Sequence, residues 1–191
     1  MNDTAIEILQ ELGIDTSYQN NTLEQLSTAD SKYLRDLKMN VKSVLAVESI
    51  SAKDALLIAL ACATNNNNTI LIDAFIQKAK ANDANDAEIA EAQACASLLS
   101  ANNVFYRYRH FVGKEFYTNA PARLRMNIMM NPVLGKELFE LISLAVSAIN
   151  GCEMCVKSHE QSVLHSGGTE QRIWDAIRLA SVITSLSKIV Y

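Results

Sequence analysis

The chain is poor in the residues that interrupt helices. Of its 191 residues only two are proline and six are glycine, and these are the two residue types least favourable inside a helix. Hydrophobic residues make up 49% of the chain, which is enough for a sizeable buried core. No stretch has the composition of a linker between domains. The sequence therefore predicts a single domain over residues 1–191 that is nearly all-α.

Long apolar runs and basic runs are also absent. No segment reaches the ~18 consecutive apolar residues of a membrane-spanning helix, and the opening MNDTAIEILQELGI carries acidic side chains where a signal peptide needs a positive flank. We therefore expect a cytoplasmic protein that does not enter a membrane. The net charge of −4 comes from interspersed signs. Without a basic run to neutralise phosphates, nucleic acid is not an expected partner.

The helical pattern divides the chain into three parts. Residues 1–36 are predicted to form a short N-terminal helical extension, and two repeat units are predicted over approximately 37–112 and 120–191. The polar run Asn65–Asn68 predicts a turn, and residues 126–132 predict a connector.

The two units resemble each other in sequence. The segment that starts at Leu57 aligns without gaps on the segment that starts at Leu141, and identical residues recur along both. Chance agreement of Ala and Leu in helical sequence is the alternative. Four positions differ in chemistry: the first unit has Leu56, Asn68, Leu71 and Phe75 where the second has Glu140, Cys152, Cys155 and His159. The sequence therefore predicts an internally duplicated helical domain whose second unit alone carries reactive groups.

The segment NGCEMCVKSHEQSVLHSGG, residues 150–168, holds two of the four cysteines and two of the three histidines. At about 100° per residue, Cys152, Cys155 and His159 fall on one face of a helix. The Asn-Gly pair ends the preceding helix, which places both cysteines in the first turn of the next. There the helix dipole favours thiolate. In a reducing compartment such a Cys-x-x-Cys pair is redox-active or metal-binding rather than a permanent link.

Glu140 lies in the preceding helix, among apolar neighbours. If the two helices pack antiparallel across the turn, its carboxylate could approach His159 and orient the imidazole. Spacing alone favours a different position, on the solvent side of its helix.

A zinc site is the competing interpretation of the same segment. Cys152, Cys155, His159 and His165 could supply four ligands, but zinc fingers draw their two pairs from separate elements, and here three donors lie close together on one helix. The redox hypothesis is therefore favoured, and His165 is interpreted as a residue of the helix end.

Two further groups carry weaker signals. Cys62 and Cys95 lie in Ala-rich helical runs and are expected to be buried. The aromatic residues Phe105, Tyr106, Tyr108 and Phe111 are interpreted as core or subunit interface.

Four stretches together resemble the alkyl hydroperoxide reductase D family of the carboxymuconolactone-decarboxylase-like superfamily: NNVFYRYRHF, ARLRMNIMMNP, FELISLAVSAINGCEMCVKSHE and IWDAIRLASVI. The resemblance extends roughly from residue 37 to the end. Its most specific part is the pattern of a glutamate, eleven residues, Cys-x-x-Cys, three residues and a histidine, which Glu140, Cys152, Cys155 and His159 meet.

The resemblance implies an all-helical, duplicated fold that assembles as a homotrimer. It also implies an antioxidant dithiol enzyme with no tightly bound cofactor, reduced by the dihydrolipoyl group of a partner protein. The implied partners are a peroxiredoxin of the alkyl hydroperoxide reductase C type, which it reduces, and a lipoylated acyltransferase with dihydrolipoamide dehydrogenase, which supply electrons. Weak reduction of alkyl and hydrogen peroxides is implied as well.

The resemblance further implies a role for each site residue. Cys155 would be the attacking thiol, Cys152 the resolving thiol and proton donor, and Glu140 with His159 the proton relay. The helix dipole alone favours Cys152 as the nucleophile, but attack also depends on solvent access, so we follow the family. The chain departs from some family members at Met154, where they have a histidine. Two alternatives stay open: a lactone decarboxylase that needs no dithiol, and a non-catalytic module clipped by zinc.

Overall fold

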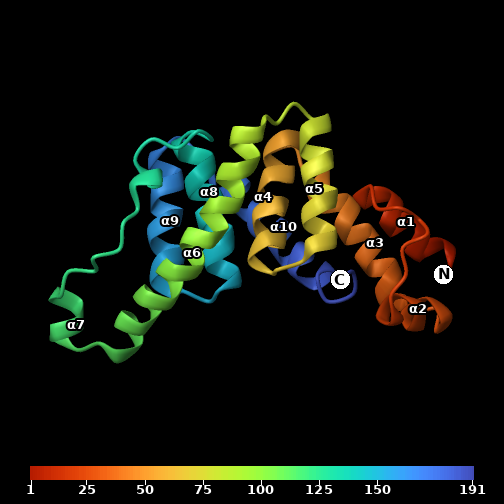
Figure 1. Cartoon of the computed structure of the whole chain (residues 1–191), viewed down its shortest axis with the longest axis horizontal. Coiled ribbons are helices and arrows are strands. Elements are labelled where there is room, and N and C mark those ends of the chain that lie inside the picture. Colours follow the sequence, from red (N-terminus) through yellow and green to blue (C-terminus); the bar gives the residue numbers. More distant parts are fainter.

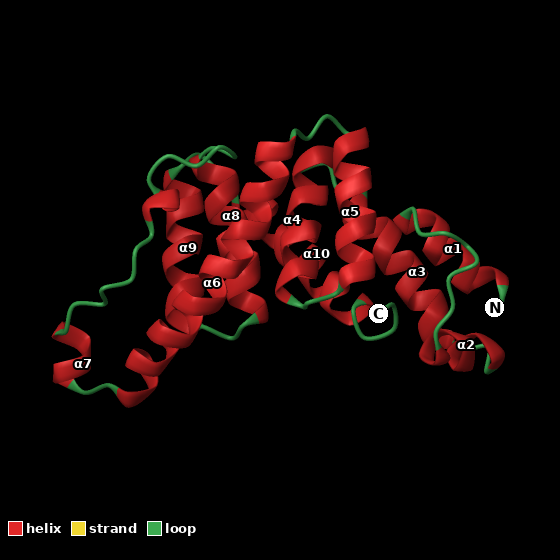
Figure 2. Ribbon diagram, viewed as in Figure 1, coloured by secondary structure: helices red, strands yellow, loops and turns green.

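The computed structural model describes residues 1–191 and contains only helices and loops (Figure 2). This confirms the all-α prediction. The elements in chain order are α1 (Asp3–Leu12), α2 (Asn21–Thr28), α3 (Lys32–Leu45), α4 (Ala52–Asn65), α5 (Thr69–Ala81), α6 (Asp86–Val112), α7 (Glu115–Asn119), the short 3-10 helix η1 (Asn127–Met129), α8 (Lys136–Ile149), α9 (Glu153–His165) and α10 (Glu170–Leu186).

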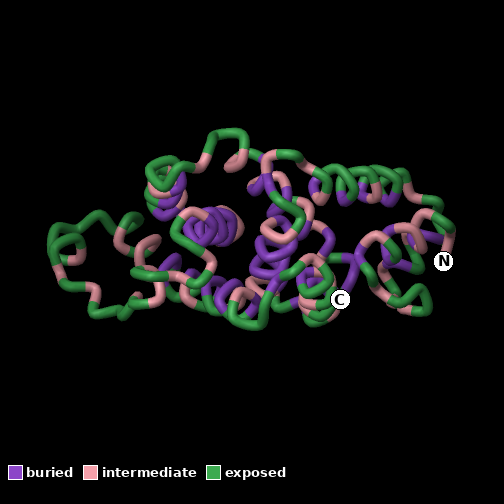
Figure 3. The backbone as a smooth tube through the Cα atoms, turned by 90° about the horizontal axis from the view of Figure 1, so that it is seen from above, coloured by how far each residue is buried: buried purple, intermediate pink, exposed green.

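Two helices form the centre of the molecule. Every residue from Ala55 to Ala63 in α4 and from Leu138 to Ser147 in α8 is buried, which requires neighbours on all sides of each helix. The helix α4 packs against α5, α6, α8 and α10, and α8 packs against α6, α9 and α10. The buried segments gather in the middle of the molecule in Figure 3, with exposed loops around them.

The helix bounds agree with the register of the sequence repeat. Ala52 and Lys136, the first residues of α4 and α8, lie 84 positions apart. The first residues of α5 and α9, and those of α6 and α10, have the same separation. The matching bounds support the duplication hypothesis, which stays a prediction.

The Asn run forms the predicted turn. Asn67 has a positive φ of 54°, a conformation that Asn tolerates better than most residues. Asn68 follows as the N-cap of α5, where its side chain accepts a hydrogen bond from the backbone N–H of Leu71. Gly151, the counterpart of Asn67 in the second unit, also has a positive φ, 67°.

The N-terminal helices form a smaller layer at one end, next to α5 (Figure 1). The helix α1 buries Ile8, Leu9 and Leu12, and it packs mainly on α3. The sequence predicted that the N-terminal extension ends at residue 36, and this position lies inside α3. The helix begins earlier, where the Ser31 hydroxyl accepts a hydrogen bond from Tyr33 N–H.

At the other end, the last turns of α6 extend beyond the packed centre and lead into α7 (Figure 1). Phe111 is 73% exposed and Phe116 is 74% exposed, so the aromatic cluster is not part of the core. Residues 120–135, which we call the connector, then return from α7 to α8 and contain η1. None of the helices combines the length and apolar character needed to cross a membrane.

Candidate active site

Cys152 and Cys155 form a disulfide where α8 ends and α9 begins. Cys152 is the N-cap residue of α9, and its side chain makes no capping hydrogen bond. The Cys-x-x-Cys pair therefore lies at a helix N-terminus, as predicted. The corresponding residue of the first unit, Asn68, does cap its helix. A sulfur thus replaces a capping oxygen at a point where free backbone N–H groups favour negative charge.

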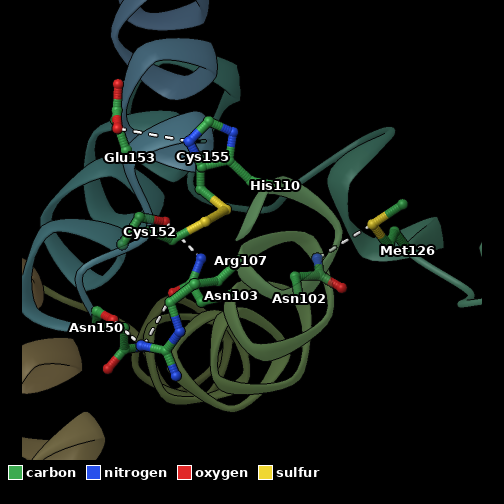
Figure 4. Close-up of a disulfide and its surroundings, with 10 residues drawn as sticks. Asn102, Asn103, Arg107, His110, Met126, Asn150, Cys152, Glu153 and Cys155 are labelled. Atoms are coloured by element: carbon green, nitrogen blue, oxygen red, sulfur yellow. Dashed lines mark hydrogen bonds and ion pairs between the residues drawn. A yellow bond between two sulfur atoms is a disulfide. The ribbon is translucent and has the colours of Figure 1, made fainter. Parts of the chain in front are cut away.

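A set of polar contacts fixes the turn before Cys152 (Figure 4). The Asn150 side-chain amide donates to Asn103 Oδ1 over 2.9 Å and accepts from Asn65 Nδ2 over 3.0 Å. The Arg107 guanidinium donates to the Asn150 carbonyl oxygen. Helices α4 and α6 therefore hold the turn from two sides, and Gly151 supplies the left-handed conformation that the turn requires.

Glu140 and His159 meet between α8 and α9. The distance between His159 Nδ1 and Glu140 Oε2 is 2.6 Å, and Glu140 is only 3% exposed. The interpretation from spacing alone, a glutamate on the solvent side of its helix, is therefore wrong. Two packed helices joined by a tight turn bring the side chains together, and helical spacing within α8 does not contain that information.

The Glu140 carboxyl is held in its charged form. Burial by itself raises its pKa, but hydrogen bonds from His159 and from Lys136, whose Nζ lies 2.8 Å from Glu140 Oε1, outweigh burial and lower the pKa below its ordinary value of 4.5. A charged carboxylate accepts from Nδ1–H of His159, which leaves Nε2 as the proton acceptor of the neutral ring. The pair can therefore take up and return a proton on the side of the ring away from Glu140.

A cavity of about 370 Å³ lies beside the disulfide. Cys155, 7% exposed, lines the cavity, whereas Cys152 is fully buried. Access therefore favours Cys155 as the reacting sulfur, although Cys152 is nearer the end of the helix dipole. The complete lining is Leu99, Asn102, Tyr106, Met126, Met129, Met154, Cys155, Ser158 and His159.

His110 approaches the site from α6. Its Nε2 lies 3.6 Å from Glu153 Oε2 (Figure 4). Lys157 pairs with the other oxygen of the Glu153 carboxylate. All three side chains are largely exposed. Met154, between the two cysteines, lines the cavity.

The remaining candidates lie outside this chemistry. Cys62 and Cys95 are free and buried, and burial raises the pKa of each thiol to about 12, so neither is a nucleophile at neutral pH. His165 is the exposed last residue of α9. No three His, Cys, Asp or Glu side chains are grouped as a metal site requires. The four zinc ligands considered from the sequence are therefore not brought together.

Sequence reasoning missed most of the cavity wall. Leu99, Asn102 and Tyr106 line it from α6, and their spacing of three and four residues was a visible sign of one helix face. Lys136 is four residues before Glu140, which was a visible sign of their ion pair. Met126 and Met129 come from the connector, and no local pattern shows where such a loop folds back.

Comparison with known proteins supports the family resemblance described from the sequence. Residues 117–190 match the model of the carboxymuconolactone decarboxylase family. A protein from Anaeromyxobacter sp. (strain K), named alkyl hydroperoxide reductase AhpD, is 41% identical over 162 residues, which cover 85% of this chain and 87% of the relative. Proteins of the same name from Rhodopseudomonas palustris (strain BisA53) and Coxiella burnetii (strain Dugway 5J108-111) are each 38% identical, and the matches cover 87% and 82% of this chain and 91% and 90% of those relatives. At this identity over most of its length, the chain belongs to the alkyl hydroperoxide reductase AhpD family.

Proposed function

We propose that this protein is an antioxidant dithiol enzyme that reduces alkyl hydroperoxides, hydrogen peroxide and a partner peroxiredoxin with electrons from dihydrolipoyl groups. The observation that carries the proposal is the Cys152–Cys155 disulfide with Cys155 and His159 on the wall of one cavity. The names of the relatives support the peroxide substrate.

In the oxidative half of the reaction, the Cys155 thiolate attacks the terminal oxygen of a hydroperoxide. The O–O bond breaks, Cys155 becomes a sulfenic acid, and the alkoxide takes a proton to leave as an alcohol. The Cys152 thiol then attacks the Cys155 sulfur, a water molecule leaves, and the disulfide forms. The two thiols have lost two electrons, and the peroxide has gained them.

The pair of His159 and Glu140 serves the proton transfers. His159 takes the thiol proton when the Cys155 thiolate forms and returns a proton to the leaving oxygen. The charged Glu140, hydrogen-bonded to Nδ1 over 2.6 Å, keeps the ring oriented. Glu140 therefore acts through His159 and is a positioning residue.

In the reductive half, a dihydrolipoyl dithiol restores the enzyme. One of its thiolates attacks Cys155, the protein disulfide breaks, and Cys152 leaves as a thiolate that takes a proton. The second lipoyl sulfur then closes the lipoyl ring and releases Cys155. Two electrons and two protons pass to the protein. A peroxiredoxin disulfide is reduced by the same exchange in the opposite direction, so the protein would connect a lipoylated acyltransferase and its dihydrolipoamide dehydrogenase to the peroxiredoxin.

We also propose that the protein is a homotrimer in which the end of α6 and α7 contact a neighbouring copy. Phe111 and Phe116 are each more than 70% exposed on this projecting segment, and Val112 is 36% exposed beside them. Exposed aromatic side chains grouped on one segment are typical of subunit interfaces.

The test of the proposed function is turnover with dihydrolipoamide and tert-butyl hydroperoxide. The wild type is expected to consume both in equal amounts, and Cys155→Ser is expected to be inactive. A Cys62→Ser variant serves as the control, since that thiol is buried and unreactive. Near-normal turnover by Cys155→Ser would refute the proposal.

A further inference from the structure

Asn102 carries the one buried side-chain oxygen or nitrogen atom that no group of the protein satisfies, its Oδ1. The residue lies on α6, is 5% exposed, and lines the cavity that Cys155 and His159 share. Its Nδ2 donates to the sulfur of Met126 over 3.1 Å, which fixes the amide on the connector side. A buried acceptor without a donor destabilises the folded chain. Oδ1 is itself closed to solvent, so a ligand that shifts the amide or the connector and brings a donor to Oδ1 gains affinity.

The rest of the cavity indicates what else that ligand contains. Six of its nine lining residues are hydrophobic, and its volume is about 370 Å³, which is within the roughly 300–1,000 Å³ of sites for small organic molecules. Hydrogen peroxide, with two heavy atoms and no apolar part, uses little of this space. The cavity fits a largely apolar chain that brings a hydrogen-bond donor to Asn102.

The position of Asn102 Oδ1 relative to the disulfide indicates which end of the ligand carries the hydrogen-bond donor. Figure 4 shows the Asn102 amide turned toward Met126 and apart from the two sulfurs. A hydroperoxide that reacts at Cys155 brings its O–H group to the sulfur itself. The donor for Asn102 therefore belongs at the far end of a chain whose reactive end lies at Cys155. A dihydrolipoyl arm has this order: a dithiol, four methylene groups and an amide N–H.

We propose that Asn102 Oδ1 accepts a hydrogen bond from the amide N–H of the dihydrolipoyl arm while Leu99, Met126 and Met129 contact its methylene chain. This inference rests on the proposed function and adds a specificity to it. Asn102 is then a positioning residue that selects an amide-linked dithiol. It takes no part in the bond changes, which are those of the reductive half described above.

The experiment compares two electron donors that differ at one group. Reduction of the Cys152–Cys155 disulfide is followed with dihydrolipoamide and with the N,N-dimethylamide of dihydrolipoic acid, which is neutral and lacks an N–H. The wild type is expected to prefer dihydrolipoamide by roughly 2- to 10-fold in kcat/KM, the effect of one neutral hydrogen bond. Asn102→Leu is expected to remove the preference by raising KM for dihydrolipoamide alone.

Two controls separate this role from a structural one. Asn102→Leu removes the unpaired Oδ1 together with the hydrogen bond to the Met126 sulfur, which is a weak acceptor, and Leu is of similar size, so the melting temperature should change little. Met129→Leu alters the apolar wall of the cavity and should change kcat/KM for both electron donors by the same factor. An Asn102→Leu variant that keeps the preference, or that slows both donors equally, would overturn the inference.

The outcome also distinguishes the inference from the proposed function. If the wild type reduces its disulfide equally well with both donors, the function stands and the role of Asn102 is wrong. If neither donor reduces the wild-type disulfide, the proposed function fails and the inference falls with it. A third arm measures oxidation of the reduced dithiol by tert-butyl hydroperoxide. Loss of that step alone in Asn102→Leu would assign the acceptor to the peroxide and overturn the proposal.

Discussion

The carboxylate of Glu140 lies 2.6 Å from Nδ1 of His159, and both residues are buried between α8 and α9. In the first half of the chain the matching positions hold Leu56 and Phe75, which are buried as well. In the register of the sequence repeat, an apolar pair therefore stands where the second half has a charged, hydrogen-bonded pair. The Glu140–His159 pair can transfer protons. It requires both residues, because a buried carboxylate that loses a hydrogen-bond donor is costly.

Replacement of His159 by Phe should separate catalysis from packing. Phe75 shows that this helix position accommodates an aromatic ring, so we expect His159→Phe to fold and to lose ~10²–10⁴-fold in turnover, the usual contribution of a proton-transfer group. Loss of the hydrogen bond to Glu140 should destabilise the variant by about 1–3 kcal/mol. Steady-state kinetics and thermal melting measure the two effects.

The double variant Glu140→Leu/His159→Phe is the matched control, since it reproduces the pair of the first half. We expect it to be inactive but to melt at a higher temperature than His159→Phe, because in that single variant the buried Glu140 Oε2 loses its donor while Lys136 holds only Oε1. Unchanged turnover in folded His159→Phe would remove His159 from the mechanism.

The ionised state of Glu140 makes part of the stability depend on pH. Its pKa in the folded chain lies below the ordinary 4.5, because the hydrogen bonds from His159 and Lys136 exceed the effect of burial. The stabilisation is therefore complete above about pH 4.5 and is lost as the pH falls through the lower, folded-state pKa. We expect the stability difference between wild type and Glu140→Gln, from urea unfolding, to shrink as the pH falls below about 4.5. A difference that grows toward low pH would contradict this assignment.

The thiols of the reduced protein should differ in reactivity. Cys155 lines the cavity, Cys152 is fully buried, and burial raises the pKa of Cys62 and Cys95 to about 12. After mild reduction, iodoacetamide should modify Cys155 first and leave Cys62 and Cys95 unmodified, as peptide mass spectrometry can show. First modification of Cys152 would favour the order that the helix dipole alone suggests.

Gly151 should tolerate Asn better than Ala. Its φ is 67°, and nothing lies within 4 Å of where a Cβ would be, so the cost of a side chain comes from the backbone conformation alone. We expect Gly151→Ala to lose about 1–2 kcal/mol, or roughly 2–8 °C in melting temperature for a chain of this size. Gly151→Asn should lose less, since Asn67 adopts a φ of 54° at the matching turn. Equal losses would show that strain at this φ does not set the cost.

The projecting end of α6 and α7 should control assembly. Phe111→Ser and Phe116→Ser remove two exposed aromatic side chains without touching the core. We expect the pair of substitutions to lower the oligomer mass in light scattering while helix content is retained. Trp174→Ser is a useful comparison, because Trp174 is also exposed, at 64%, but lies on α10. If neither set changes the mass, the proposed trimer contact is wrong.

Local sequence determined much of this protein. The scarcity of proline and glycine and the spacing of apolar residues predicted the helices, since these depend on the propensities of neighbouring residues. The positions of Asn67, Asn68, Gly151 and Cys152 marked the turns and helix starts for the same reason. Helical periodicity placed Cys152, Cys155 and His159 on one face.

Only the tertiary structure decided which groups surround Cys152, Cys155 and His159. The contact of Glu140 with His159 and the burial of Cys152 depend on the packing of α8 against α9, and the cavity depends on where α6 and the connector lie. Asn102 lies about fifty residues before the cysteines, and no pattern near it shows that its amide oxygen is unpaired. Such contacts join segments distant in sequence, and their energies arise from burial and hydrogen bonding in the assembled core rather than from local propensity.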